Sequence, residues 1–167
     1  QKAITSDEAK LTALLLNWKA RQHLFSFTPA GNEKARLANL AAVEADPTQP
    51  YGYVGLTCVH INRYRWGWTD EDPIVELNAA RRYARKAVQV GPEYYDAHTA
   101  MAYVHIQEGA LDKSVARFRK ALELNPNDTS AMAARAEALT YGGQADEAED
   151  LMLRVVRLDP LHQDWIK

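Results

Sequence analysis

Three prolines recur at a constant interval in the second half of the chain. Pro92, Pro126 and Pro160 follow one another at steps of 34 residues. Each stands two residues after a similar amphipathic phrase: KAVQV at 86–90, KALEL at 120–124 and RVVRL at 154–158. A phrase that returns at a fixed period of about 20 to 50 residues indicates stacked repeat units. This period constrains the fold more strongly than any other feature of the sequence.

A period of 34 residues is that of tetratricopeptide repeats, whose unit is a pair of antiparallel helices. Small and apolar positions in residues 95–128 fit such a pair, with Gly109 at the turn. The next unit repeats this pattern, although Arg135 stands where a large apolar residue is usual. One pair leaves an apolar face uncovered, so the units must stack. We therefore predict an all-α fold, a right-handed tetratricopeptide superhelix of antiparallel helix pairs.

The repeat continues upstream with one interruption. Pro47 ends an earlier unit but precedes Pro92 by 45 residues, eleven more than the period. The apolar spacing on either side places this surplus near 63–73, between two helices. The predicted units of the single array are 6–47, 48–92, 93–126 and 127–160, with 161–167 beginning a further helix. Helices are expected at 6–26, 30–45, 50–64, 74–90, 93–108, 111–124, 128–141 and 145–158.

Composition argues against several classes of function. The chain has 20 Lys and Arg against 22 Asp and Glu, a net charge of −2, so binding to nucleic acid or anionic membranes is not expected. The single cysteine, Cys58, can form neither an internal disulfide nor a multi-cysteine zinc site, which favours a reducing compartment. No apolar run is long enough to span a membrane. We predict a cytoplasmic location.

The sequence contains no recognisable set of catalytic or cofactor-binding residues. The one tight acidic cluster, at 70–72, is expected in a loop that caps a helix. The five histidines lack the spacing of a zinc site, and the glycines do not form a phosphate-binding loop. We therefore predict no enzymatic activity in this segment, no cofactor and no metal.

The concave groove of the superhelix is the first candidate surface for binding a protein or peptide. There, the first helix of each unit presents residues that stacking does not use. The repeat register gives Tyr51, Val54, Cys58, Ile61, Asn62, Asp96, Thr99, Tyr103, Ile106, Gln107, Ala133, Glu137, Thr140 and Tyr141. Carboxylate-clamp domains bind a terminal carboxylate through Lys and Asn residues. At the corresponding positions this chain has Val54, Cys58, Ala100, Ser130 and Ala134. A carboxylate-clamp cochaperone is therefore not predicted.

The eleven surplus residues are the second candidate surface. Tyr64, Trp66 and Trp68 concentrate aromatic area in a segment that the repeat does not need. Aromatic side chains are favoured at binding hot spots. They either anchor a partner or fold back over the second helix near Tyr83, and the sequence leaves both alternatives open.

Three phrases occur together in order: FTPAGN at 27–32, WGWTDEDP at 66–73 and LDPLHQDW at 158–165. With them, the chain resembles the tetratricopeptide region that follows class III adenylate/guanylate cyclase domains in bacteria. Similar arrays also follow winged-helix transcriptional regulators. Either resemblance implies that catalysis or DNA binding belongs to an N-terminal domain outside this segment. The segment itself would then be a regulatory or interaction module in signalling, and its partner a peptide, its own catalytic domain or a second copy.

Overall fold

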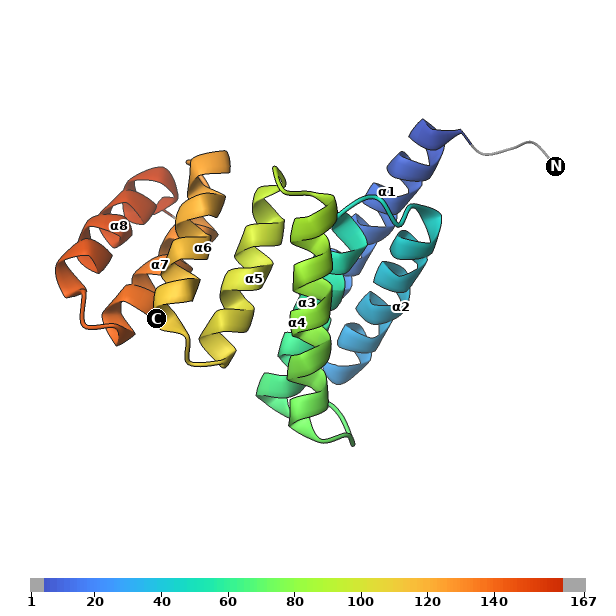
Figure 1. The fold of residues 1–167 in the computed structure, drawn as a ribbon, viewed down its shortest axis with the longest axis horizontal. Helices are drawn as coiled ribbons and strands as arrows, with labels where there is room; N and C mark the ends of the chain where they lie inside the picture. The colour runs from blue at the N-terminus through green and yellow to red at the C-terminus, as the bar shows by residue number, and fades with distance from the viewer. Residues whose placement is uncertain (1–4, 161–167) are drawn as a thin grey trace. The chain divides into compact units, whose positions relative to one another are not determined.

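The structure is a computed structural model that describes residues 5–160. These residues form helices without any strand (Figure 1), which confirms the predicted all-α class. The helices are α1 (Ser6–Leu24), α2 (Pro29–Ala45), α3 (Tyr51–Trp66), α4 (Pro73–Val90), α5 (Tyr95–Gln107), α6 (Leu111–Leu124), α7 (Thr129–Tyr141) and α8 (Ala145–Leu158). Each begins and ends within a few residues of its predicted bounds. The helix expected at 161–167 lies outside the described residues.

Local signals in the sequence explain where several helices begin. Thr28 accepts a hydrogen bond from a backbone N–H in the first turn of α2, and Pro29 occupies the first helical position. Asp72 and Pro73 start α4 in the same way. Asp128 caps α7. Such caps satisfy backbone donors that have no partner inside the helix, so they determine the starting residue.

The chain divides into two compact units after Pro92. Within the first unit, α1 packs on α2, α2 on α3 and α3 on α4, and α1 also contacts α3. Within the second unit, α5 packs on α6, α6 on α7 and α7 on α8. Each helix thus packs against its successor inside its own unit, as expected for stacked helix pairs.

Alanine dominates the buried surfaces of both units. The buried clusters are Ala20, Ala35 and Val59 in the first unit, and Ala102, Phe118, Ala131 and Ala134 with Met132, Ala136, Leu139, Ala148, Leu151 and Val155 in the second. Small side chains allow the helix axes to approach closely. A few large residues, among them Phe118 and Leu139, fill the remaining space.

Buried asparagines tie together the first three helices. The Nδ2 of Asn17 donates to Oδ1 of Asn39 at 2.9 Å and to the backbone oxygen of Tyr51 at 2.9 Å. The Nδ2 of Asn39 donates in turn to the backbone oxygen of Ala35, also at 2.9 Å. Gly55 of α3 faces this amide so closely that a Cβ there would lie 2.1 Å from the Oδ1 of Asn39. The three helices therefore meet at a polar contact with no space for another carbon.

The surplus residues between Pro47 and Pro92 do not form one loop. Helix α3 has 16 residues against 13 in α5, and α4 has 18 against 14 in α6. The linker between them, 67–72, is also twice as long as its counterpart, 108–110. In the segment expected as an insertion, residues 63–66 end α3, residues 67–72 form the linker and Pro73 begins α4, so the surplus is shared between longer helices and a longer linker. Helix α3 continues until Gly67, which adopts a left-handed conformation at its C-terminus.

Candidate functional site

An aromatic cluster forms where the α1–α2 turn meets the end of α3. The ring of Phe27 lies 5.3 Å from the ring of Trp66 and 5.3 Å from the ring of Trp68, both in edge-to-face geometry. The guanidinium of Arg65 lies 5.5 Å from the Trp66 ring centre. Phe27 is nevertheless 55% exposed and Trp66 48% exposed. We call Phe27, Trp66 and Trp68 the aromatic cluster; it is held in place by its own contacts and still presents a large apolar area.

The backbone conformation at the end of α3 and in the α1–α2 turn positions these rings. Gly67 ends α3 at φ 63°, and the backbone N–H of Trp68 donates to the oxygen of Arg63 at 3.2 Å. Phe27 has φ 49°, a left-handed conformation that costs a residue other than glycine about 1–2 kcal/mol. Its contacts with two tryptophans offset part of that cost, since edge-to-face aromatic pairs stabilise by about 0.5–1.5 kcal/mol each. The cluster is therefore a defined local structure.

The lengthened helix ends meet the rest of the unit through a network of charged side chains. Nδ1 of His60 lies 2.5 Å from Oε2 of Glu76, which is buried in the first turn of α4. Arg63 approaches Oε1 of Glu76 at 3.5 Å and Oε2 of Glu33 at 2.5 Å. Glu33 of α2 also pairs with Arg36 at 2.7 Å. The network links α2, α3 and α4, and its member Arg63 precedes Trp66 by three residues in α3.

Opposing effects set the protonation states in this network. Burial acts to raise the pKa of Glu76, but hydrogen bonds from His60 and Thr69 and the charge of Arg63 outweigh it and lower that pKa. Burial lowers the pKa of His60, and this effect is larger than the increase caused by the hydrogen bond and the charge of Glu76. A hydrogen bond from Arg36 is the main cause of a lowered pKa at Glu33. At neutral pH, a neutral His60 therefore donates its Nδ1–H to an ionised Glu76.

Tyr83 has a different contact from the one that sequence suggested. The fold-back contact of Trp66 and Trp68 is with Phe27, whereas the Tyr83 ring stacks on His60 at 5.4 Å. Phe27 was not identified as part of this surface from sequence. The charged network was missed as well, although Glu76 falls on the inward spacing of α4 with Ala80 and Ala84, which is an unusual place for a carboxylate.

The residues predicted for the groove lie on α3, α5 and α7. Val54, Ile61 and Asp96 are buried; Tyr51, Cys58, Asn62, Thr99, Tyr103, Ile106, Gln107 and Ala133 are partly buried; Glu137, Thr140 and Tyr141 are exposed. Tyr103 packs edge-on against Phe118 at 5.4 Å, so its ring serves the core of its unit. Tyr141 is 71% exposed. Whether these residues bind a partner stays a prediction.

Residues 5–160 form neither a cluster of metal-binding side chains nor a membrane-spanning helix. No group of three or more histidine, cysteine or acidic side chains there could hold a metal ion. None of the helices in this range combines the length and apolarity needed to cross a bilayer.

Comparisons with known proteins agree with the architecture. Two family models described as tetratricopeptide repeat match the chain, at residues 76–129 and 105–166. No curated protein matches it. Among solved structures, a thermophilic TPR protein of Thermus thermophilus is 26% identical, with 89% of this chain and 75% of that one covered and a TM-score of 0.77.

More distant structures share the fold alone. MamA is 18% identical, with 91% of this chain and 81% of that one covered and a TM-score of 0.60. The first TPR domain of Spaghetti (RPAP3), solved with the HSP90 peptide SRMEEVD, is 18% identical, with 80% and 95% covered and a TM-score of 0.56. Together with the helix packing in residues 5–160, these matches show that the chain contains tetratricopeptide repeats and has the fold of a tetratricopeptide solenoid.

Proposed function

We propose that this chain is a non-catalytic module that binds a protein or peptide, and that the aromatic cluster is part of its contact surface. The single observation that carries the proposal is the exposure of Phe27 and Trp66, which remain about half accessible although they contact each other. Exposed aromatic groups held in a defined geometry are typical of binding hot spots, because little side-chain entropy is lost when a partner covers them.

The fold supports the same function. The related domain of Spaghetti (RPAP3) was solved with a peptide bound, so this architecture can hold one. The clamp positions of the present chain carry Val54, Cys58, Ala100, Ser130 and Ala134, none of which is basic. We therefore expect recognition to depend mainly on apolar contacts at the aromatic cluster and, as a further candidate, on the predicted groove.

We further propose that the module is the regulatory region of a bacterial class III adenylate/guanylate cyclase in the cytoplasm. The phrases at 27–32 and 66–73 support this context, and they contain all three residues of the aromatic cluster. The partner would be the catalytic domain of the same protein or a second copy. A winged-helix regulator is the alternative context.

Replacing Trp66 and Trp68 by alanine in the full-length protein tests the contact surface. We expect loss of self-association in sedimentation, or loss of coupling between this module and the upstream domain, with only a modest decrease in melting temperature. Trp18→Ala is the matched control, because Trp18 is 65% exposed on α1 and lies outside the aromatic cluster. A large decrease in melting temperature with association and coupling intact would refute the proposed contact.

The cyclase context has its own test. The full-length protein should convert ATP or GTP to the cyclic nucleotide with Mg²⁺ or Mn²⁺, and the tryptophan substitutions should change that rate. An upstream winged-helix domain and the absence of cyclase activity would overturn the cyclase assignment and favour the transcriptional regulator.

A further inference from the structure

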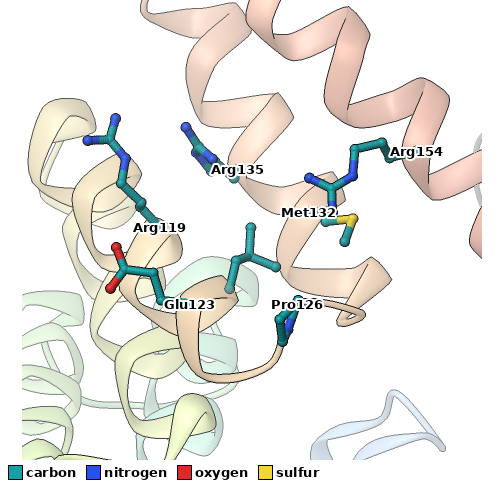
Figure 2. A pocket seen from close by; sticks show the side chains of 7 residues that line it. Arg119, Glu123, Pro126, Met132, Arg135 and Arg154 are labelled. Carbon is teal, nitrogen blue, oxygen red and sulfur yellow. The ribbon is translucent and has the colours of Figure 1, made fainter.

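A small pocket in the second unit is lined by arginines from three successive helices. Figure 2 shows Arg119 on α6, Arg135 on α7 and Arg154 on α8 around one space, whose apolar side includes Leu122 and Met132. The pocket has a volume of about 230 Å³. Most small-molecule sites have volumes of about 300–1,000 Å³, so this space fits one or two side chains better than a nucleotide.

Positive charge exceeds negative charge around this pocket. Arg135 contacts Glu147, and Glu123 lines the same space, so two carboxylates face three guanidinium groups. Within residues 5–160, neither Arg119 nor Arg154 has an ion-pair partner. Glu147 contacts Arg135 and Glu123 contacts Lys120 at 3.7 Å, so the guanidinium groups of Arg119 and Arg154 lie at this pocket without a carboxylate partner in this part of the chain.

Arg135 is the most constrained member of the group. Its side chain is only 11% exposed, and its Nε is buried without a hydrogen-bond partner among the described residues. Burial is the main cause of a lowered pKa at Arg135; the charges of Arg119 and Arg154 add to this effect, and Glu147 opposes it. A buried donor without a partner is costly, so an acceptor that enters the pocket would stabilise the arrangement.

We propose that this pocket binds a carboxylate side chain of an acidic peptide, with a neighbouring apolar side chain of that peptide resting on Leu122 and Pro126. Guanidinium groups match carboxylates in geometry, and a pair formed beside apolar surface is screened less than one in open water. The apolar side of the pocket favours a peptide over a bare anion. The net charge of −2 argues against a nucleic acid.

This inference rests on the proposed peptide-binding function but concerns a separate surface. The aromatic cluster belongs to the first unit, whereas the arginine pocket is formed by α6, α7, α8 and the α6–α7 turn of the second. It also differs from the predicted groove, whose residues lie on α3, α5 and α7. The two surfaces can therefore be tested independently.

The probe is a fluorescein-labelled peptide of alternating glutamate and leucine, with a lysine–leucine peptide of equal length as control. Fluorescence anisotropy with the 167-residue chain should show that the acidic peptide binds and the lysine–leucine peptide does not. The affinity for the acidic peptide should decrease as the salt concentration rises. Arg119→Gln and Arg154→Gln should each reduce affinity about tenfold or more, as expected for charge-assisted hydrogen bonds. Arg157→Gln is the matched control, because Arg157 is exposed on α8 and does not line the pocket, and it should change affinity less than about twofold.

A second readout is the Nε–H resonance of Arg135 in a ¹⁵N-correlated spectrum, which should shift when the acidic peptide binds. Failure of this peptide to bind would overturn the proposal, as would an equal effect of Arg157→Gln. Binding of inorganic phosphate without binding of peptide would also overturn it and indicate a simple anion site. The Trp66→Ala/Trp68→Ala chain should bind the acidic peptide like the parent, so failure here is distinguishable from failure of the aromatic-cluster contact.

Discussion

Replacing Gly55 by alanine should severely destabilise the first unit. The new Cβ would lie 2.1 Å from Oδ1 and 2.3 Å from Cγ of Asn39, distances that no real Cβ adopts. Asn39 is fully buried, accepts a hydrogen bond from Asn17 and donates one to Ala35. To make room for the methyl group, its amide must leave both partners or the helices must separate.

The expected loss follows from these contacts. A buried polar group left without its hydrogen bond costs about 1–3 kcal/mol, and two such bonds are at stake. Crowding a packed interface adds about 1–3 kcal/mol. The better helix propensity of alanine returns about 1 kcal/mol. We therefore expect Gly55→Ala to lower the free energy of unfolding by about 4 kcal/mol, which corresponds to a decrease of roughly 10 °C in melting temperature.

Tryptophan fluorescence is a suitable probe for urea unfolding, because three of the four tryptophans, Trp18, Trp66 and Trp68, belong to the first unit. Gly142→Ala is the control, and its unfolding is followed by circular dichroism because Gly142 lies in the second unit. Its Cβ would lie 3.4 Å from the nearest atoms, an ordinary contact, so stability should change by less than about 1 kcal/mol. An unfolding free energy for Gly55→Ala within about 1 kcal/mol of the parent would refute the packing argument.

Two further expectations concern the lengthened helix pair. Because burial lowers the pKa of His60, the unfolded chain binds that proton more tightly than the folded chain, and the free energy of unfolding should decrease as pH falls from about 6.5 through the lowered pKa. Thermal melts of the parent and of His60→Gln should show that the substitution removes this pH-dependent part of the stability. Below about pH 4.5, protonation of Glu76, whose pKa is lowered, decreases the free energy of unfolding further. Gly67→Ala should cost about 1–2 kcal/mol because Gly67 has φ 63°, whereas Gly67→Asn should cost less; equal unfolding midpoints in urea for the two variants would contradict this explanation.

Helix positions were predictable because their signals are local. The pairs Thr28-Pro29 and Asp72-Pro73 start α2 and α4, and Gly109 stands in the turn between α5 and α6 with φ 70°. The surplus of eleven residues was also countable from sequence. The secondary structure of these residues was not predictable, because the spacing between prolines gives their number and does not show whether a helix continues through them.

The candidate surface was only half predictable. Trp66 and Trp68 stood out by composition, but Phe27 is 39 residues away from Trp66 and has a left-handed backbone that is unusual for phenylalanine. Its role arises when the α1–α2 turn meets the end of α3. The predicted groove residues can be assigned to helices from sequence, yet their part in binding stays a prediction.

The sequence by itself determined the repeat, the helices and the absence of recognised catalytic motifs, because periodic spacing and capping act over a few residues. Only the tertiary structure decided which distant side chains meet. The pairing of Glu76 with His60 and Arg63, and the gathering of Arg119, Arg135 and Arg154 around one pocket, depend on how neighbouring helices pack. An inward-facing charge can be recognised from its register. Its partner is set by the distance and angle between helices, and these follow from the packing of the whole unit.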